Sequence, residues 1–160
     1  MQRSSIKMIT TVALMTGCWV ALACSRTDNN HSADADKKTR DTSAKFTQYY
    51  NRGEELYQQH CSNCHQVDGS GLGLLFPPLN KSDYLDKNLD DVLCLMRYGK
   101  SGELIVNGKQ FNKEMKGIAT LSDLEIAEIA TYIYNTWEND RGLIEVSYVS
   151  NAMQTCETQR

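Results

Sequence analysis

Five consecutive residues, Cys61-Ser62-Asn63-Cys64-His65, bring two thiols and an imidazole together within little more than one helical turn. Thiols three positions apart on a helix face the same way. Each thiol can therefore add to one vinyl group of a haem that lies along the turn, and the imidazole can bind the iron from the same segment. The C-x-x-C-H pattern thus predicts one covalently attached haem c, with Cys61 and Cys64 as thioether sites and His65 as an axial ligand of the iron.

Other interpretations of the cysteine pair remain open at this point. A C-x-x-C pair can be half of a zinc site, but the sequence has no second C-x-x-C or H-x-x-x-H that would complete four ligands. It can be a thiol–disulfide motif, but that motif usually lies on a βαβ pattern, which this chain lacks. Chance occurrence is the third interpretation, and the features below weigh against it.

A haem iron bound by one histidine has an open sixth position, which a methionine can fill. Three of the six methionines fall within the first 15 residues, which leaves Met96, Met115 and Met153. Met96 stands among Leu and Val in an amphipathic helical pattern that favours core packing, and Met153 lies in the C-terminal tail. Met115 lies in a predicted loop, far in sequence from His65, and no helical neighbours explain it as core. We therefore predict Met115 as the second axial ligand, and His/Met ligation is typical of electron transfer.

The pocket around such a haem can also be anticipated from the sequence. The segment Phe76-Pro77-Pro78-Leu79 cannot be helix interior, because its prolines force extended geometry and lack N–H donors. Its carbonyls are free to accept, and a metal-bound histidine normally donates its second N–H to a fixed acceptor. We predict the Pro77 carbonyl as that acceptor. Leu75 and Tyr57 are expected to line the pocket.

The first 23 residues are predicted to be an export signal that is not part of the fold. Small residues stand immediately before Cys24, as in the lipobox of bacterial lipoproteins, where the cysteine becomes the acylated N-terminus. Cys18 is a second candidate for lipidation, and unlipidated cleavage after Ala23 is the alternative to both. The signal places the protein outside the cytoplasm, in the periplasm or on the outer surface. Acylation of Cys24 would attach it to a membrane.

Residues 24–45 are predicted to be a flexible tether, and residues 46–160 the ordered domain. The tether is polar and has no apolar residue larger than Ala, so it cannot bury enough surface to offset its ordering entropy. Disulfides survive outside the cytoplasm. The remaining pair, Cys94 and Cys156, is therefore expected to be bonded, with two separate buried thiols as the alternative, because sequence does not give their distance.

Hydrophobic periodicity and capping residues predict a mainly helical domain. Asn107-Gly108, between β-branched residues, predicts a small hairpin just before the methionine loop, and Ser122 with Glu125 forms a capping box. The expected elements are helices over about Gly53–Cys61, over Leu89–Tyr98 and from Ser122 onward, and a short helix through Val146, Tyr148 and Val149. A hairpin is expected within Glu103–Phe111 and an irregular stretch over Phe111–Gly117.

These residues together resemble the class I cytochromes c, the monohaem modules that serve as electron-carrier subunits or domains of periplasmic oxidoreductases. The resemblance covers about Gly53 to Trp137 and is carried by C-x-x-C-H, by Pro77-Pro78-Leu79, by Met115 and by the helix that follows it. It implies an all-α fold whose N- and C-terminal helices cross at Gly53. It also implies haem ligation by His65 and Met115 and haem packing by Leu79. One departure is Lys116, where such modules commonly have proline after the methionine.

The expected function is single-electron transfer between exported or membrane redox partners, without enzymatic activity of its own. A net charge of −3 gives no basic field for nucleic acid. The alternative is a five-coordinate haem enzyme or a sensor of gases or peroxide, if Met115 does not bind the iron. A subunit with an assembly role in a larger oxidoreductase is compatible with the carrier.

Overall fold

The structure is a computed structural model that describes residues 30–158. The predicted signal, with Cys18 and Cys24, lies outside the described residues, as do residues 159 and 160. Within the described part, no helix is both long and apolar enough to cross a membrane.

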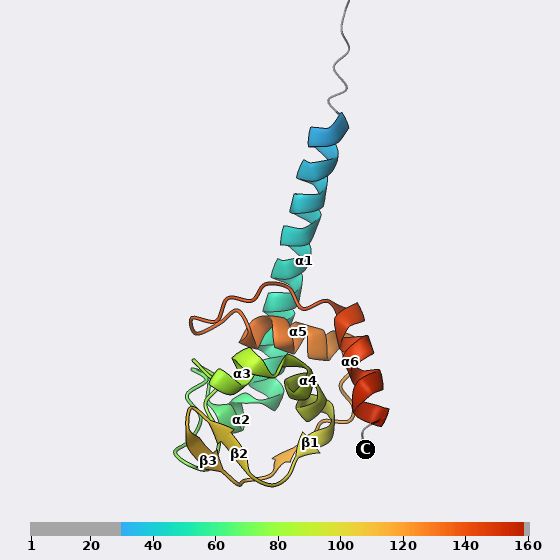
Figure 1. The fold of residues 1–160 in the computed structure, drawn as a ribbon. Helices are drawn as coiled ribbons and strands as arrows, with labels where there is room; N and C mark the ends of the chain where they lie inside the picture. Colours follow the sequence, from blue (N-terminus) through green and yellow to red (C-terminus); the bar gives the residue numbers. More distant parts are fainter. Residues whose placement is uncertain (1–29, 159–160) are drawn as a thin grey trace, which may run out of the picture.

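The described chain is mostly helical, with two small antiparallel sheets (Figure 1). This confirms the predicted class, a helical fold with a small hairpin. The helices are α1 (Asn30–His60), α2 (Ser62–His65), α3 (Asp83–Lys87), α4 (Leu89–Tyr98), α5 (Asp123–Ile133) and α6 (Val146–Thr158). The strands are β1 (Gly99–Lys100), β2 (Leu104–Val106), β3 (Lys109–Phe111) and β4 (Met115–Lys116).

The long helix α1 differs from the sequence prediction in its first half. A coil was expected over residues 24–45, whereas α1 begins at Asn30 and projects away from the rest of the domain (Figure 1). A polar segment can continue a helix that a packed neighbour has nucleated. Each added residue then gains one hydrogen bond. The second half of α1 is the packed part, as predicted for the segment that leads into the thiols.

The core forms where α1 crosses α5. Leu56 and Tyr57 of α1 are buried against Ile129 and Tyr132 of α5, and α4 and α6 complete the same cluster. At the crossing, a Cβ atom on Gly53 would lie 2.0 Å from the carbonyl oxygen of Glu128. The absent side chain lets the two helix backbones touch. This confirms the crossing that the resemblance implied, with α5 as the last helix of the segment that the resemblance covers.

Three elements have the bounds and caps that local signals predict. Helix α4 ends at Gly99, and Ser122 and Glu125 form the capping box of α5 with both reciprocal hydrogen bonds present. The hairpin β2–β3 turns at Asn107-Gly108, with Val106 paired to Lys109. These elements carry their own start and stop signals, so neighbouring structure does not have to set them.

The segment around Met115 is more ordered than predicted. An irregular stretch was expected over Phe111–Gly117, but Met115 and Lys116 form β4, which pairs with β1 directly after α4. A two-residue strand is too short to show a periodic pattern in the sequence. Strand β4 forms because the fold brings Met115 and Lys116 beside β1, at the end of α4.

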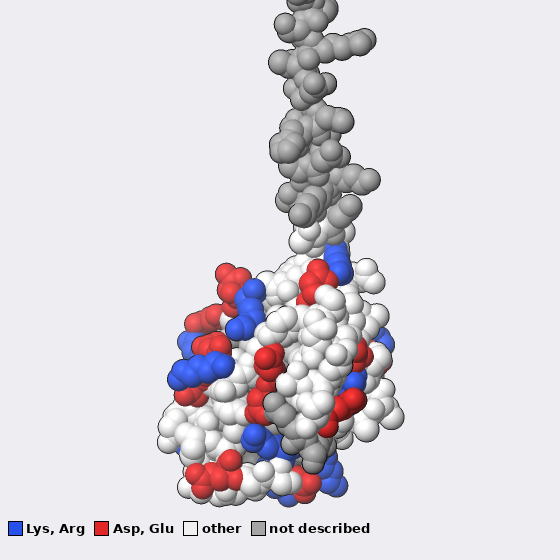
Figure 2. All heavy atoms as spheres, turned by 45° about the vertical axis from the view of Figure 1, so that its right-hand side comes forward, with Lys and Arg blue, Asp and Glu red and all other residues white. Residues whose placement is uncertain are grey.

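The C-terminal helix α6 packs beside α4 and α5. A disulfide joins Cys94 of α4 to Cys156 of α6, with Cα atoms 5.9 Å apart, as predicted for the leftover pair. The surface has charges of both signs interspersed over the face seen in Figure 2. That face therefore offers no extended field of one sign that would steer a charged partner over long distances.

Candidate functional site

One cavity of about 440 Å³ brings the predicted site residues together. It lies between the end of α1, the helices α4 and α5, and the two small sheets. Cys61, Cys64, His65 and Met115 all line it, and most of the rest of the wall is apolar. Its volume falls within the range of about 300–1,000 Å³ that is usual for cofactor sites, which are mostly apolar with a few convergent polar groups.

The two thiols lie at the junction of α1 and α2. The amide of Cys61 donates to the carbonyl of Tyr57, and the amide of His65 donates to the carbonyl of Cys61, so the helical geometry continues through the motif. Both cysteines are free of disulfides. Burial, aided by the neighbouring Cys64, raises the pKa of the Cys61 thiol to about 12. A thiol–disulfide nucleophile needs a lowered pKa, so Cys61 does not suit that role.

The imidazole of His65 is buried and oriented by a single backbone group. Its Nδ1 donates to the carbonyl oxygen of Pro77 at 2.9 Å, because a carbonyl can only accept. This leaves Nε2 as the ring nitrogen that can bind a metal. Burial lowers the pKa of His65, while the hydrogen bond to Pro77 acts in the opposite direction, so the neutral form that a ligand needs is favoured.

The structure separates the three methionine candidates. Met153 is buried in the core on α6 and does not line the cavity. Met96 and Met115 both line it. Met96, however, is 6% exposed and packs within the hydrophobic core of α4, whereas Met115 lies half-buried on β4 outside that cluster. Met115 is thus the methionine that core packing does not already engage.

The remaining predicted pocket residues divide. Tyr57 and Leu79 line the cavity, and the Tyr57 hydroxyl donates to the carbonyl of Gln66 at 2.6 Å. The structure does not bring Leu75 to the cavity, where the sequence placed it, and its side chain is 56% exposed. Backbone hydrogen bonds between Leu72 and Phe76 fold the intervening residues into a tight outward turn, and an apolar residue type alone could not reveal that.

Sequence reasoning missed the polar part of the wall. Ser82, Tyr84 and Lys100 all line the cavity. The Tyr84 hydroxyl and the Lys100 ammonium group both contact the carboxylate of Asp91. No spacing rule links these residues, since α3, α4 and β1 are brought together only by the fold.

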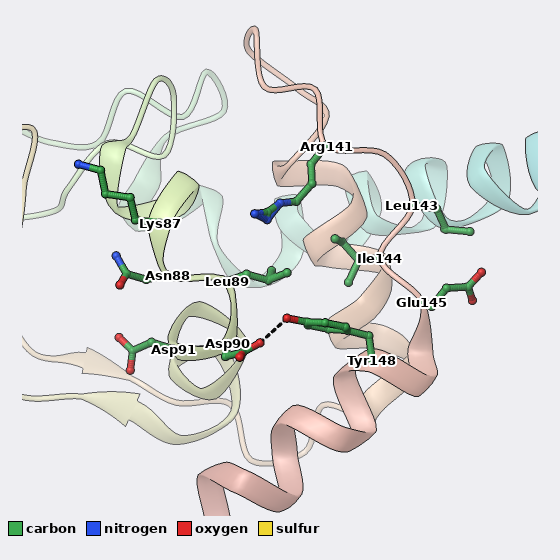
Figure 3. Close-up of a pocket in the computed structure, with 10 residues that line it drawn as sticks. All are labelled: Lys87, Asn88, Leu89, Asp90, Asp91, Arg141, Leu143, Ile144, Glu145 and Tyr148. Atoms are coloured by element: carbon green, nitrogen blue, oxygen red, sulfur yellow. Dashed lines mark hydrogen bonds between the residues drawn. The ribbon is translucent and has the colours of Figure 1, made fainter.

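A second depression, of about 760 Å³, lies between the start of α4 and the segment before α6 (Figure 3). Arg141 and Tyr148 point into it, and the Tyr148 hydroxyl donates to Asp90 at 2.6 Å. Its lining has no thiol, imidazole or thioether. It therefore lacks the groups for covalent attachment or soft-metal ligation, and the hydrogen bond serves to dock α6 on α4.

The residues of the first cavity fit a covalently held haem. They supply two thiols on one helical turn, one neutral imidazole with a free Nε2, a thioether and an apolar wall. A site for a metal ion alone is not indicated, because residues 30–158 contain no group of three or more His, Cys, Asp or Glu side chains arranged to hold one.

Comparison with known proteins points the same way. A family model described as "Cytochrome C oxidase, cbb3-type, subunit III" matches residues 48–133. The chain is 34% identical over 89 residues to "Cytochrome c-552" of Thermus thermophilus, which covers 53% of this chain and 67% of that protein. It is also 34% identical over 89 residues to a protein of the same name from a defined strain of that species, covering 53% of this chain and 60% of that protein.

A third relative is much larger than the matched part. The chain is 28% identical over 109 residues to "Alcohol dehydrogenase (quinone), cytochrome c subunit" of Gluconobacter oxydans. The match covers 66% of this chain but 22% of that subunit. The similarity therefore concerns about a fifth of that subunit's length.

Proposed function

We propose that this chain, which belongs to the cytochrome c family whose model is described as cytochrome c oxidase, cbb3-type, subunit III, carries one covalent haem with His65 and Met115 as axial ligands. In this role it passes single electrons between redox protein partners. The observation that carries the proposal is the meeting of Cys61, Cys64, His65 and Met115 on one largely apolar cavity.

The haem, when bound, supplies the redox chemistry, and the protein sets its position and surroundings. Cys61 and Cys64 would fix the macrocycle to the end of α1. The Pro77 carbonyl holds the His65 ring so that Nε2 is the atom available to the iron. The apolar wall excludes water, and methionine sulfur ligation raises the reduction potential relative to two nitrogen ligands.

The ligand assignment has a matched test, because two methionines line the same cavity. In the oxidised wild-type protein we expect the weak band near the red end of the visible spectrum that arises from sulfur-to-iron charge transfer. Met115→Leu is expected to abolish the band, while Met96→Leu keeps it. The opposite pattern would assign Met96 as the ligand. A high-spin wild-type spectrum without the band would favour the five-coordinate enzyme or sensor instead.

Covalent attachment is tested separately by mass. The purified wild-type chain should carry the added mass of one porphyrin after acid denaturation, and Cys61→Ser with Cys64→Ser should remove it. A colourless wild-type chain without the added mass would refute the haem proposal as a whole.

We further propose that the chain is exported and attached to a membrane through acylated Cys24. Support comes from the sequence alone, in the small residues before Cys24 and the polar run after it. Cys24→Ser should move the protein from the membrane fraction to the aqueous fraction, while Cys18→Ser leaves it in place. Release by Cys18→Ser alone would assign lipidation to that residue.

A further inference from the structure

The backbone around Met115 is held by the last turn of α4. Strand β1 follows α4 directly and pairs with β4, so that Lys100 lies opposite Met115. One turn earlier, the carbonyl of Met96 accepts a hydrogen bond from the amide of Ile118 at 2.9 Å. The segment is therefore paired with β1 at Met115 and bonded to α4 three residues beyond it.

These two backbones are in direct contact. A Cβ atom on Gly117 would lie 2.3 Å from the carbonyl carbon of Tyr98 and 2.4 Å from the amide nitrogen of Gly99. A Cβ atom on Gly99 would lie 2.4 Å from the carbonyl oxygen of Met115. Because no side chain separates them, a displacement of the end of α4 passes to Met115 without being absorbed.

The end of α4 is in turn held by α6. The disulfide between Cys94 and Cys156 joins the middle of α4 to the last turns of α6. The Tyr98 hydroxyl, at the last residue of α4, donates to the Glu157 carboxylate at 3.1 Å. Since the Tyr148–Asp90 hydrogen bond joins the starts of the two helices, α6 braces α4 along its length.

An ion pair between Arg97 and Asp123 also links α4 to α6. Arg97 donates to the Leu121 carbonyl at 2.9 Å and to the Asp123 carboxylate at 2.6 Å. The second oxygen of Asp123 accepts from the Ser150 hydroxyl of α6, also at 2.6 Å. Arg97 and Asp123 are 16% and 31% exposed, so water competes only in part for this contact. One ion pair thus joins the end of α4, the chain that follows Met115, and α6.

Helix α6 lies outside residues 48–133, which the family model matches. We propose that α6, its disulfide and the Arg97–Asp123 pair form a clamp that positions Met115. Arg97, Cys94 and Cys156 are positioning residues. They do not line the cavity, and they act on Met115 through the backbone of β1 and β4. The inference rests on the proposed role of Met115 as an axial ligand.

The test measures how readily added imidazole displaces the methionine from the oxidised holoprotein. Two variants open the clamp at different points: Arg97→Gln keeps the disulfide, and Cys94→Ala with Cys156→Ala keeps the ion pair. Each should tighten imidazole binding by about tenfold, because apparent affinity rises with the fraction of molecules whose sixth position is open. In both variants, the sulfur–iron band should also disappear on heating well before the helices unfold.

Two controls separate positioning from general stability. Arg52→Gln removes an exposed ion pair to Glu55 on α1, and Ile126→Val weakens the core of α5 away from the cavity. Both should leave imidazole affinity unchanged, although Ile126→Val lowers the unfolding temperature. If the clamp variants lower the unfolding temperature but bind imidazole as the wild type does, the clamp is refuted and α6 is only structural. A Met115→Leu variant that binds imidazole no more tightly than the wild type would instead refute the ligand assignment.

Discussion

The contact between α1 and α5 at Gly53 offers a sharp test of the packing. Gly53 lies within α1, and its replacement by alanine would normally favour the helix by about 1 kcal/mol. Here the new Cβ atom would lie 2.0 Å from the carbonyl oxygen of Glu128, 2.6 Å from its carbonyl carbon and 2.9 Å from the Cβ atom of Tyr132. Two of the three obstructing atoms are backbone, so no rotamer change relieves the overlap.

The cost follows from how far α5 has to move. Protein Cβ atoms essentially never approach another heavy atom closer than 3.0 Å, so the two helices must separate by about 1 Å at the crossing. The surrounding residues, among them Leu56, Tyr57 and Ile129, are buried, and their contacts loosen together. Overpacking of a core costs about 1–3 kcal/mol and occasionally more. Against a backbone obstacle we expect the upper end, which leaves a net loss of about 2 kcal/mol for Gly53→Ala.

Guanidinium chloride unfolding of the holoprotein, followed by far-ultraviolet circular dichroism, measures this loss. With a slope of about 4 kcal/mol/M, the midpoint should fall by about 0.5 M. The control is Asn51→Ala, an exposed position two residues earlier on α1, which should be neutral or slightly stabilising. If Gly53→Ala matches the wild type or exceeds it, the helices do not touch through their backbones and the reasoning fails.

Two further predictions concern single interactions. The hydrogen bond from Ser150, with Arg97 adding to it, holds the pKa of Asp123 below its usual range. The stability that the charged Asp123 carboxylate contributes is therefore present above about pH 4, and it is lost as pH falls through the folded-state pKa. Asp123→Asn should therefore cost about 1 kcal/mol at pH 7 and progressively less below pH 4 in unfolding titrations, and a pH-independent difference would contradict this. Asn107 has φ of 50°, and its side chain hydrogen-bonds the backbone of Asp83 and Lys81. Asn107→Ala should lower the free energy of unfolding by about 2 kcal/mol, and Asn107→Gly, which tolerates a positive φ, by about half of that. Equal losses for the two variants in chemical unfolding would refute the backbone contribution.

Local signals predicted a large part of the fold. Helix α4 has the expected bounds because its apolar residues recur at helical spacing and Gly99 ends it. Helix α5 and the hairpin carry a capping box and an Asn-Gly turn, which specify structure within a few residues. In each case the information lies inside the element itself, so a single sequence suffices to read it.

Other features depend on neighbours that the sequence does not place. The first half of α1 has the polar composition that is typical of disordered segments, yet it continues the helix formed by its second half. Helix α3 has five residues, too few to show a period. The contacts of Tyr84 and Lys100 with Asp91 join three elements that only the fold brings together. Leu75 shows the converse, an apolar residue that the loop turns outward.

The two proposed axial ligands illustrate the same division within one site. His65 belongs to the five-residue motif, and its acceptor Pro77 follows 12 residues later, so a short segment supplies both the ring and its hydrogen-bond acceptor. Met115 is positioned by the end of α4, by the chain around Leu121 and by α6, which lies beyond the part that the family model matches. The histidine side of the site should therefore tolerate changes elsewhere in the chain. The methionine side should respond to substitutions in a C-terminal helix that has no contact with the cavity, because its geometry is set by backbone contacts that converge from distant segments.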